Sequence, residues 1–152
     1  MSSGVTAPRG FRAAGIEAGI KDGAPDLALV VADAPCAAAG VFTQSGAAAG
    51  PVILSREQLA AGRARAIVVN SGCANAATGP AGLDDAREMT ELTAAALGCP
   101  PEEVVVASTG VIGVRLPTDR VRNGIAEAAA QLSREQGADA ARAIRTTDTK
   151  PK

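Results

Sequence analysis

Two segments of the sequence place hydroxyl side chains and glycines directly after runs of β-branched residues. The first reads IVVNSGCANA over residues 67–76, and the second reads VVVASTGVIG over residues 104–113. Each pattern predicts a buried strand that runs into a turn of small residues. Small residues leave backbone N–H groups accessible, which suits the binding of an anion or of the oxyanion formed in acyl transfer. Ser108 and Thr109 could equally be turn hydroxyls bonded to their own backbone, so the pattern alone leaves both interpretations open.

The composition excludes several other mechanisms within this chain. There is no histidine, so neither a Ser-His-Asp triad nor a Cys-His pair can form, and no metal can be held by histidine. A general base must be a carboxylate, a lysine, an α-amino group or a group from another chain. The three cysteines, Cys36, Cys73 and Cys99, are widely spaced, which is typical of reduced thiols and not of a disulfide framework. We expect Cys73 to be a small buried residue, and we expect no metal and no bound cofactor.

Charge and aromatic content argue against nucleic-acid binding. Lys and Arg together number 15 against 16 acidic residues, and Phe11 and Phe42 are the only aromatic residues. A nucleic-acid-binding protein would show a basic stripe or stacking side chains. The N-terminal residues lack an apolar signal core, and no apolar run is long enough to span a bilayer. We therefore expect a cytoplasmic protein whose core of small aliphatic side chains packs closely.

The remaining pattern predicts a single α/β domain over residues 1–152, made of mixed layered sheets and helices. Apolar runs separated by turn formers such as residues 22–25 and 33–35 predict antiparallel strands, followed by two strands with buried character. The expected strands are Phe11–Ile20, Leu27–Ala32, Ala38–Thr43, Arg65–Asn70 and Val104–Ala107.

Helical periodicity and capping residues predict four helices. Ser55 is expected to cap the first helix and Gly62 to stop it, and the acidic pair Asp84-Asp85 is expected in the first turn of the second. The expected helices are Ser55–Leu59, Leu83–Leu97, Asp119–Leu132 and Ala138–Arg145. The chain then ends on the polar sequence TTDTKPK, residues 146–152.

Taken in order, these segments resemble the ornithine acetyltransferase family, the bifunctional glutamate N-acetyltransferases of arginine biosynthesis. The resemblance covers essentially the whole chain, and its most specific combination is NSGxANAxTG, ASTGVIG and TTDTxPK. The segments that carry it are VTAPRGFRAAGIEAGIK at 5–21, DLALVVAD at 26–33, AAGVFT at 38–43, RAIVVNSGCANAATG at 65–79, VVVASTGVIG at 104–113 with Leu116-Pro117, and AIRTTDTKPK at 143–152.

The resemblance implies a definite mechanism. Members of the family are precursors that cleave themselves before a threonine, which gives an α chain and a β chain. The new N-terminal threonine of the β chain is the nucleophile, and its own α-amino group can act as the base, so no histidine is needed. The acetyl group passes from N-acetylornithine to this threonine and then to glutamate, and some members also use acetyl-CoA as the donor.

The resemblance also implies roles for three residues of this chain. Thr109 and Gly110 match the threonine and glycine that form the family's oxyanion hole, and Thr146 matches a substrate-contacting position. It implies a β-chain partner, higher oligomers of αβ units, and an α/β fold that the two chains complete together.

One departure from the family limits what this chain can do alone. The family's α chain continues past TTDTxPK through a glycine-rich stretch with a substrate-binding lysine to the cleavage site, whereas this sequence ends at Lys152. We expect it to be the α-chain part, truncated before the cleavage site and inactive by itself. Two alternatives remain: a self-cleaving aminopeptidase of related fold, and a non-catalytic binding or assembly fragment that holds a carboxylate at the NSG and STG loops.

Overall fold

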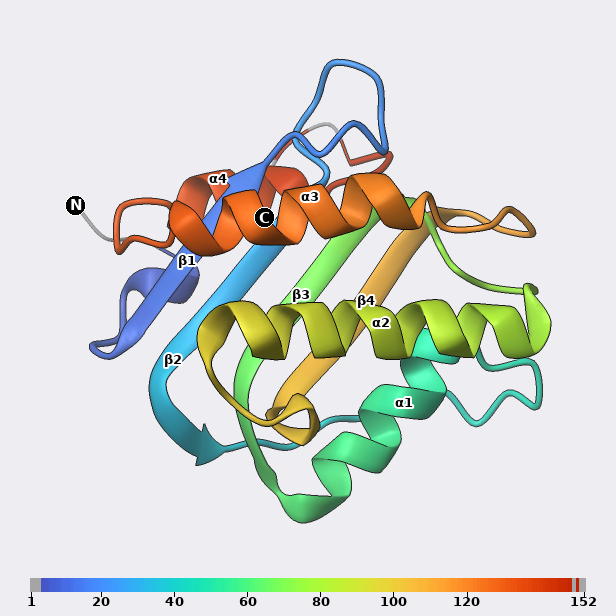
Figure 1. Ribbon diagram of the computed structural model, residues 1–152, viewed down its shortest axis with the longest axis horizontal. Helices are drawn as coiled ribbons and strands as arrows, with labels where there is room; N and C mark the ends of the chain where they lie inside the picture. The colour runs from blue at the N-terminus through green and yellow to red at the C-terminus, as the bar shows by residue number, and fades with distance from the viewer. Residues whose placement is uncertain (1–3, 149, 151–152) are drawn as a thin grey trace.

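The computed structural model describes residues 4–148 and 150 of the 152-residue chain. Its centre is one four-stranded sheet in the order β1-β2-β3-β4 (Figure 1). The strands are β1 (Phe11–Ile16), β2 (Leu27–Ala37), β3 (Arg63–Cys73) and β4 (Val104–Val111). The first three pair antiparallel and β3 pairs parallel with β4. The expected α/β class and the antiparallel start are confirmed.

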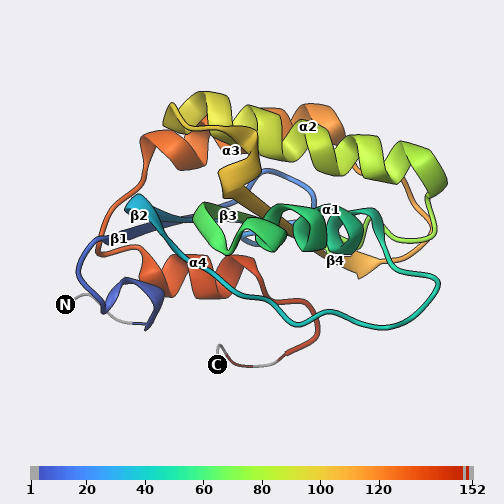
Figure 2. The same ribbon diagram turned by 90° about the horizontal axis from the view of Figure 1, so that it is seen from below.

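Four α-helices cover this sheet in layers. Figure 2 shows α2 and α3 on one face and α4 on the other, while α1 lies beside β4. The helices are α1 (Gly50–Gln58), α2 (Gly79–Leu97), α3 (Thr118–Ala130) and α4 (Gly137–Ala143), and the 3-10 turns are η1 (Gly4–Thr6), η2 (Leu59–Ala61) and η3 (Pro101–Glu103).

The connection from β3 through α2 to β4 decides where a site can form. Two parallel strands need a long crossover, and the 19-residue helix α2 supplies it. The carboxyl ends of β3 and β4 consequently lie side by side at one edge of the sheet. These are the segments that carry NSG and STG, and ligands of α/β sheets bind at this kind of edge.

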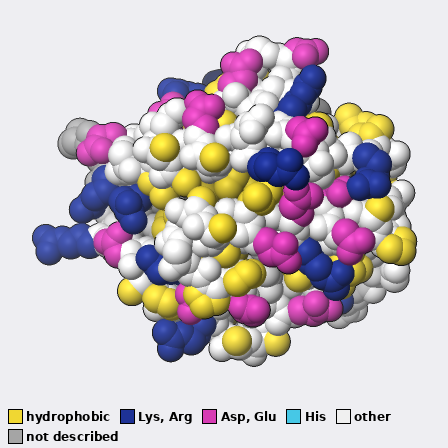
Figure 3. All heavy atoms as spheres, viewed as in Figure 1, with side chains coloured by type: hydrophobic (Ala, Val, Ile, Leu, Met, Phe, Trp, Pro, Cys, Tyr) yellow, Lys and Arg dark blue, Asp and Glu magenta, His cyan; other side chains and the backbone are white. Residues whose placement is uncertain are grey.

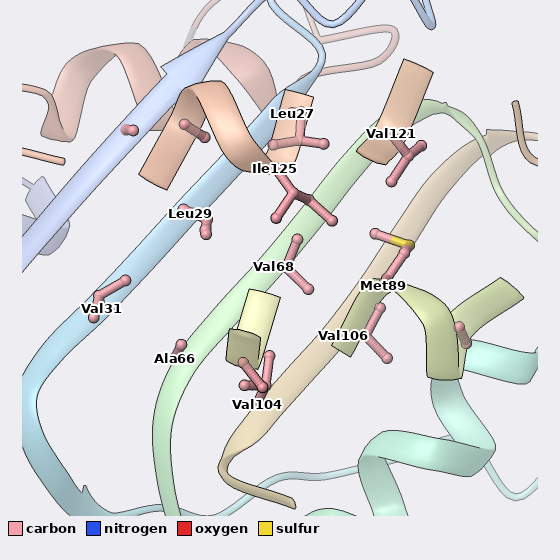
Figure 4. Packing of buried hydrophobic residues seen from close by; sticks show 14 of the residues in the cluster. Leu27, Leu29, Val31, Ala66, Val68, Met89, Val104, Val106, Val121 and Ile125 are labelled. Atoms are coloured by element: carbon pink, nitrogen blue, oxygen red, sulfur yellow. The ribbon is translucent and has the colours of Figure 1, made fainter. Parts of the chain in front are cut away.

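The core lies between the sheet and the helices α2 and α3 (Figure 4). Leucine and valine side chains from β2, β3 and β4 meet Met89 of α2 and Ile125 of α3 there. On the opposite face, the buried residues between α4 and the strands β1 and β2 are alanines, and the partly buried Val30 and Val69 pack against them. A Cβ added to Gly15 would lie 2.2 Å from the backbone of Asp139, so this helix touches the sheet backbone. The close packing expected from the lack of aromatic residues is confirmed here.

Ser55 has a different role from the helix cap that its position suggested. Helix α1 begins five residues earlier, at Gly50, with Pro51 in its first turn, a position that proline favours. The buried Ser55 hydroxyl donates to the carbonyl of Val106 at 2.6 Å and accepts from its N–H at 3.0 Å. Helix α1 therefore satisfies the backbone at the outer edge of β4, an edge that would otherwise be open to pairing. The expected stop at Gly62 is confirmed by its left-handed conformation after η2.

Two predictions about strands are wrong. Residues 38–43 form no strand, and Val41 is fully exposed. They directly follow β2, which already has β1 on one side and β3 on the other, so they cannot pair back onto it. The apolar composition of this segment was misleading. Residues 33–35, expected as a turn, lie inside β2, where the pairing with β3 shifts register between Val31 and Cys36. Such an irregularity bends a strand without ending it.

The acidic pair of α2 is also placed differently. Because α2 begins at Gly79, with Pro80 in its first turn, Asp84 and Asp85 lie in the second turn. Asp85 is buried and accepts two hydrogen bonds from the Arg115 guanidinium, at 3.0 and 2.8 Å. This pairing raises the pKa of Arg115. It fixes the segment after β4 to α2, and the expected end of α2 at Gly98 is confirmed.

The face of the molecule covered by α2 and α3 carries both acidic and basic side chains. Figure 3 shows acidic and basic side chains interspersed over this face, with apolar side chains between α2 and α3. No helix within the described residues has both the length and the apolar character that a membrane crossing requires.

Candidate functional site

The ends of β3 and β4 form a tightly packed pair of bends. We call residues 71–73 and 109–111 the paired bend. Gly72 lies opposite Gly110 in the parallel register, and both have positive φ, +104° and +132°. A Cβ on Gly110 would lie 2.3 Å from the carbonyl carbon of Gly72. Only glycine fits this contact, so the sequence dictates the close approach of the two backbones.

The polar side chains of NSGCANA hold the bend in place. Asn70 donates to the carbonyl of Cys73 at 2.9 Å, and the Ser71 hydroxyl donates to the carbonyl of Ala143 at 2.5 Å. Asn75, which has a positive φ of 47°, donates to the carbonyl of Gly82 at 2.7 Å. Cys73 is buried, with its thiol directed at the Val114 carbonyl. These side chains form hydrogen bonds to backbone carbonyls of the protein itself, as the turn interpretation of this motif predicts.

Thr109 and Gly110 of the STG motif, by contrast, face an open hollow of about 530 Å³. We call it the threonine hollow. The three residues singled out from the sequence, Thr109, Gly110 and Thr146, lie in its wall although 37 positions separate Thr109 from Thr146 in the chain. The complete lining is Lys21, Gly72, Thr109, Gly110, Val111, Thr146 and Thr147. Ser108 does not line the hollow, and its buried hydroxyl oxygen has no partner among the described residues.

Two hydrogen bonds bring the C-terminal segment to the paired bend. Ser71 binds the carbonyl of Ala143, and the Lys21 ammonium donates to the carbonyl of Arg145 at 2.8 Å. The Arg145 guanidinium in turn donates to the carbonyl of Asp148 at 3.1 and 2.8 Å, which closes a turn. Thr146 is therefore placed at the hollow by its neighbours on both sides. Thr149, which was expected as part of the same polar tail, lies outside the described residues.

Lys21 is held by a loop that the sequence analysis did not identify. The first strand was expected to run to Ile20 but ends at Ile16. Asp26, which is fully buried, accepts the backbone N–H groups of Ala18, Ile20 and Lys21 at 2.7, 2.5 and 2.8 Å. A carboxylate surrounded by three backbone donors fixes the loop in one conformation. One signal was available: Lys21 is the only lysine before residue 150, and it directly follows a strand pattern.

We expect Asp26→Asn to loosen this loop selectively. The side-chain amide would place an N–H group against backbone N–H groups, so at least one buried donor would lose its partner at a cost of about 3 kcal/mol. Amide hydrogen exchange of residues 17–22, followed by mass spectrometry, should become about 100-fold faster. Asp33→Asn is the matched control, because Asp33 is exposed and pairs with Arg12 at the surface. Unchanged exchange in Asp26→Asn would contradict this role.

The electrostatics of the hollow centre on Lys21. Burial lowers the pKa of the Lys21 ammonium; Asp26 acts in the opposite direction, and Arg145 lowers it further. Among the described residues that line the hollow, none is acidic. The wall thus combines backbone groups of two glycines, threonine hydroxyls and one partly desolvated cation, which suits a ligand with carbonyl or carboxylate oxygens.

Two further features of the described residues bear on alternative chemistry. A hollow of about 380 Å³ beside α1 and α2 is lined by Leu54, Glu57, Gln58, Ala61, Arg87, Thr90, Glu91, Pro101 and Glu102, and contains none of the predicted site residues. No group of three or more Cys, Asp or Glu side chains in the described part of the chain is arranged to hold a metal ion.

Comparison with known proteins places this arrangement in a family. Over its full length the chain is 57% identical to a protein of Symbiobacterium thermophilum named arginine biosynthesis bifunctional protein ArgJ, and 51% identical to a protein of the same name from Thermosynechococcus vestitus. It spans only 39% and 37% of the length of these curated relatives.

Solved structures agree with these sequence relatives. A crystal structure of ornithine acetyltransferase complexed with ornithine, from Mycobacterium tuberculosis, superimposes with a TM-score of 0.94 at 49% identity, covering 97% of this chain and 81% of that one. The ArgJ protein of Bacillus halodurans gives 0.91 at 40% identity, covering 97% and 78%. The ArgJ family profile matches residues 12–152. The chain therefore belongs to the ArgJ family.

Proposed function

We propose that this chain forms part of an acetyltransferase of arginine biosynthesis that moves an acetyl group from N-acetylornithine to glutamate. Membership of the ArgJ family supports the reaction class. The observation that carries the proposal is the threonine hollow, which Thr146 lines together with Thr109 and Gly110 of the paired bend. Since the chain spans 39% of the length of its relative, the nucleophile is assigned to a partner segment, the β chain.

In the proposed reaction the N-terminal threonine of the β chain attacks the acetyl carbonyl of N-acetylornithine. Its α-amino group accepts the hydroxyl proton and passes it to the ornithine nitrogen as the C–N bond breaks, which leaves an acetyl ester. The amine of glutamate then attacks the ester, and the threonine hydroxyl is restored. Each step forms a tetrahedral intermediate with a negative oxygen, and we assign its stabilisation to the Thr109 hydroxyl and the Gly110 N–H. Thr146 is assigned to substrate binding.

The rigidity of the paired bend supports this assignment. An oxyanion hole is effective when its donors are fixed before the charge develops. Gly72 and Gly110 are in backbone contact, and Asn70 and Ser71 anchor the first bend. The donors therefore need no reorganisation during the reaction, which is the property the chemistry requires.

The proposal predicts acetyl exchange by the complete protein, meaning this chain with the remainder of its family's length. Incubation with N-[¹⁴C]acetylornithine and glutamate should give labelled N-acetylglutamate, without bound metal or cofactor. An added arm with acetyl-CoA and glutamate tests whether acetyl-CoA is a second donor. Cleavage of peptide amides without acetyl exchange would favour the aminopeptidase alternative. Saturable binding of N-acetylornithine with neither activity would favour a non-catalytic fragment, and either result would reject the proposal.

A further inference from the structure

Lys21 lies in the wall of the threonine hollow but has no part in the acetyl transfer described above. Its side chain crosses the paired bend: a Cβ on Gly72 would lie 2.7 Å from Lys21 Cγ. Its ammonium reaches the C-terminal segment, where it binds the Arg145 carbonyl at 2.8 Å. Lys21 thus lies between the bend that carries Gly110 and the segment that carries Thr146.

This position leaves Lys21 with capacity to bind a ligand. An ammonium group has three N–H donors, and the Arg145 carbonyl accepts one of them. The backbone of Lys21 is fixed by Asp26, so its side chain starts from a defined point. Burial is the largest influence on the ammonium and lowers its pKa, which means that part of its hydration has been removed. An anionic ligand in the hollow would replace the lost hydration.

The chemistry of the proposed substrates indicates which anion this is. In N-acetylornithine the acetylated nitrogen and the carboxylate are attached to the same carbon, so a group that binds the carboxylate must lie beside the group that binds the acetyl oxygen. Lys21 and Thr109 line the same hollow. Glutamate carries the same α-carboxylate on the carbon that bears its attacking amine, while the two side chains differ. One cation at this place can therefore serve both half-reactions.

We propose that Lys21 binds the α-carboxylate of both amino-acid substrates and is a specificity-determining residue of the threonine hollow. The inference rests on the proposed function, because it takes its ligand from that reaction. It makes α-carboxylate recognition a property of this chain, located next to the groups assigned to the acetyl oxygen.

The test compares two acetyl donors, N-acetylornithine and its α-carboxamide, in the complete protein. Lys21→Met removes the ammonium, and Lys21→Gln removes the charge while keeping a donor that can reach for the Arg145 carbonyl. With N-acetylornithine, both variants should lose about 10- to 100-fold in kcat/KM, mainly through a higher KM. With the carboxamide, which carries no charge for Lys21 to bind, the same variants should stay within about threefold of the parent protein.

The controls separate this role from a structural one. Arg12→Met also removes one positive charge, but at the start of β1, the opposite end of the sheet, and should leave both donors unaffected. Equal losses on both donors would mean that Lys21 only holds the Arg145 segment in place, and no loss on either would remove it from the site. Both results overturn the inference while acetyl transfer by the parent protein stands. If the parent protein transfers no acetyl group at all, the proposed function itself has failed.

Discussion

Replacing Thr109 by valine should slow acetyl transfer in the complete protein by about 10²- to 10³-fold. Valine keeps the size and branching of threonine and fits β4 equally well, so the change removes the hydroxyl and little else. Thr109 lies in the wall of the threonine hollow, where a negative charge develops on the acetyl oxygen in the proposed reaction. A donor used mainly in the transition state affects kcat more than KM, so the loss should fall on kcat.

Thr109→Ser is the matched control for this change. Serine keeps the hydroxyl and loses only a methyl group, so it should retain most of the rate. Steady-state kinetics with N-acetylornithine and glutamate measure both variants against the parent protein. Equal rates for the valine and serine variants would show that the Thr109 hydroxyl does not stabilise the reacting oxygen.

Gly110→Ala should destabilise the protein by about 3 kcal/mol and abolish acetyl transfer with it. The new Cβ would lie 2.3 Å from the carbonyl carbon of Gly72 and 2.7 Å from the nitrogen of Cys73. Both are backbone atoms, so β3 and β4 must move apart. The residue must also hold a φ of +132°, which a side chain disfavours. Urea unfolding followed by circular dichroism measures the change in the free energy of unfolding.

Gly113→Ala separates the two causes of the lower stability of Gly110→Ala, which are the steric contact of the new Cβ and the positive φ. Gly113 also has a positive φ, +81°, but a Cβ there would have no atom within 4 Å. It therefore reports the backbone strain alone, about 1–2 kcal/mol. A Gly110 variant no less stable than the Gly113 variant would contradict the close contact between the two bends.

The strands and helices with strong local patterns were predictable from the sequence. The β-branched runs of β3 and β4 and the 3.6-residue periodicity of α2 and α3 reflect burial on one face, which a sequence shows directly. Which segments pair as strands could not be predicted in this way. Residues 38–43 have the composition of a strand and form none, because β2, which they follow, already pairs with β1 and β3.

The ends of the strands and helices were predicted less well, because they also depend on contacts between segments far apart in the sequence. The strands β3 and β4 were expected to stop at Asn70 and Ala107, but they continue through Cys73 and Val111 because each supports the other across the paired bend. Ser55 has the sequence context of a cap, yet it bonds to β4, 51 residues away. Long-range contacts of this kind leave no local signal.

The residues of the candidate site were likewise predicted only in part. Thr109, Gly110 and Thr146 were identified by resemblance to a family, and their gathering in one hollow depends on contacts that the sequence does not display. Lys21 and Asp26 were missed because a lysine after a strand and an aspartate after a proline are ordinary surface residues in most sequences. Here Asp26 is fully buried and Lys21 partly so, and burial is decided by the tertiary fold.

The most direct test of this account is a crystal structure of the complete protein soaked with N-acetylornithine while glutamate is withheld, so that the acetyl group stays on the nucleophile. We predict that the acetyl carbonyl oxygen will lie about 2.7–3.1 Å from the Thr109 hydroxyl and the Gly110 nitrogen. An acetyl oxygen that points away from the paired bend, with both groups beyond hydrogen-bonding distance, would contradict it.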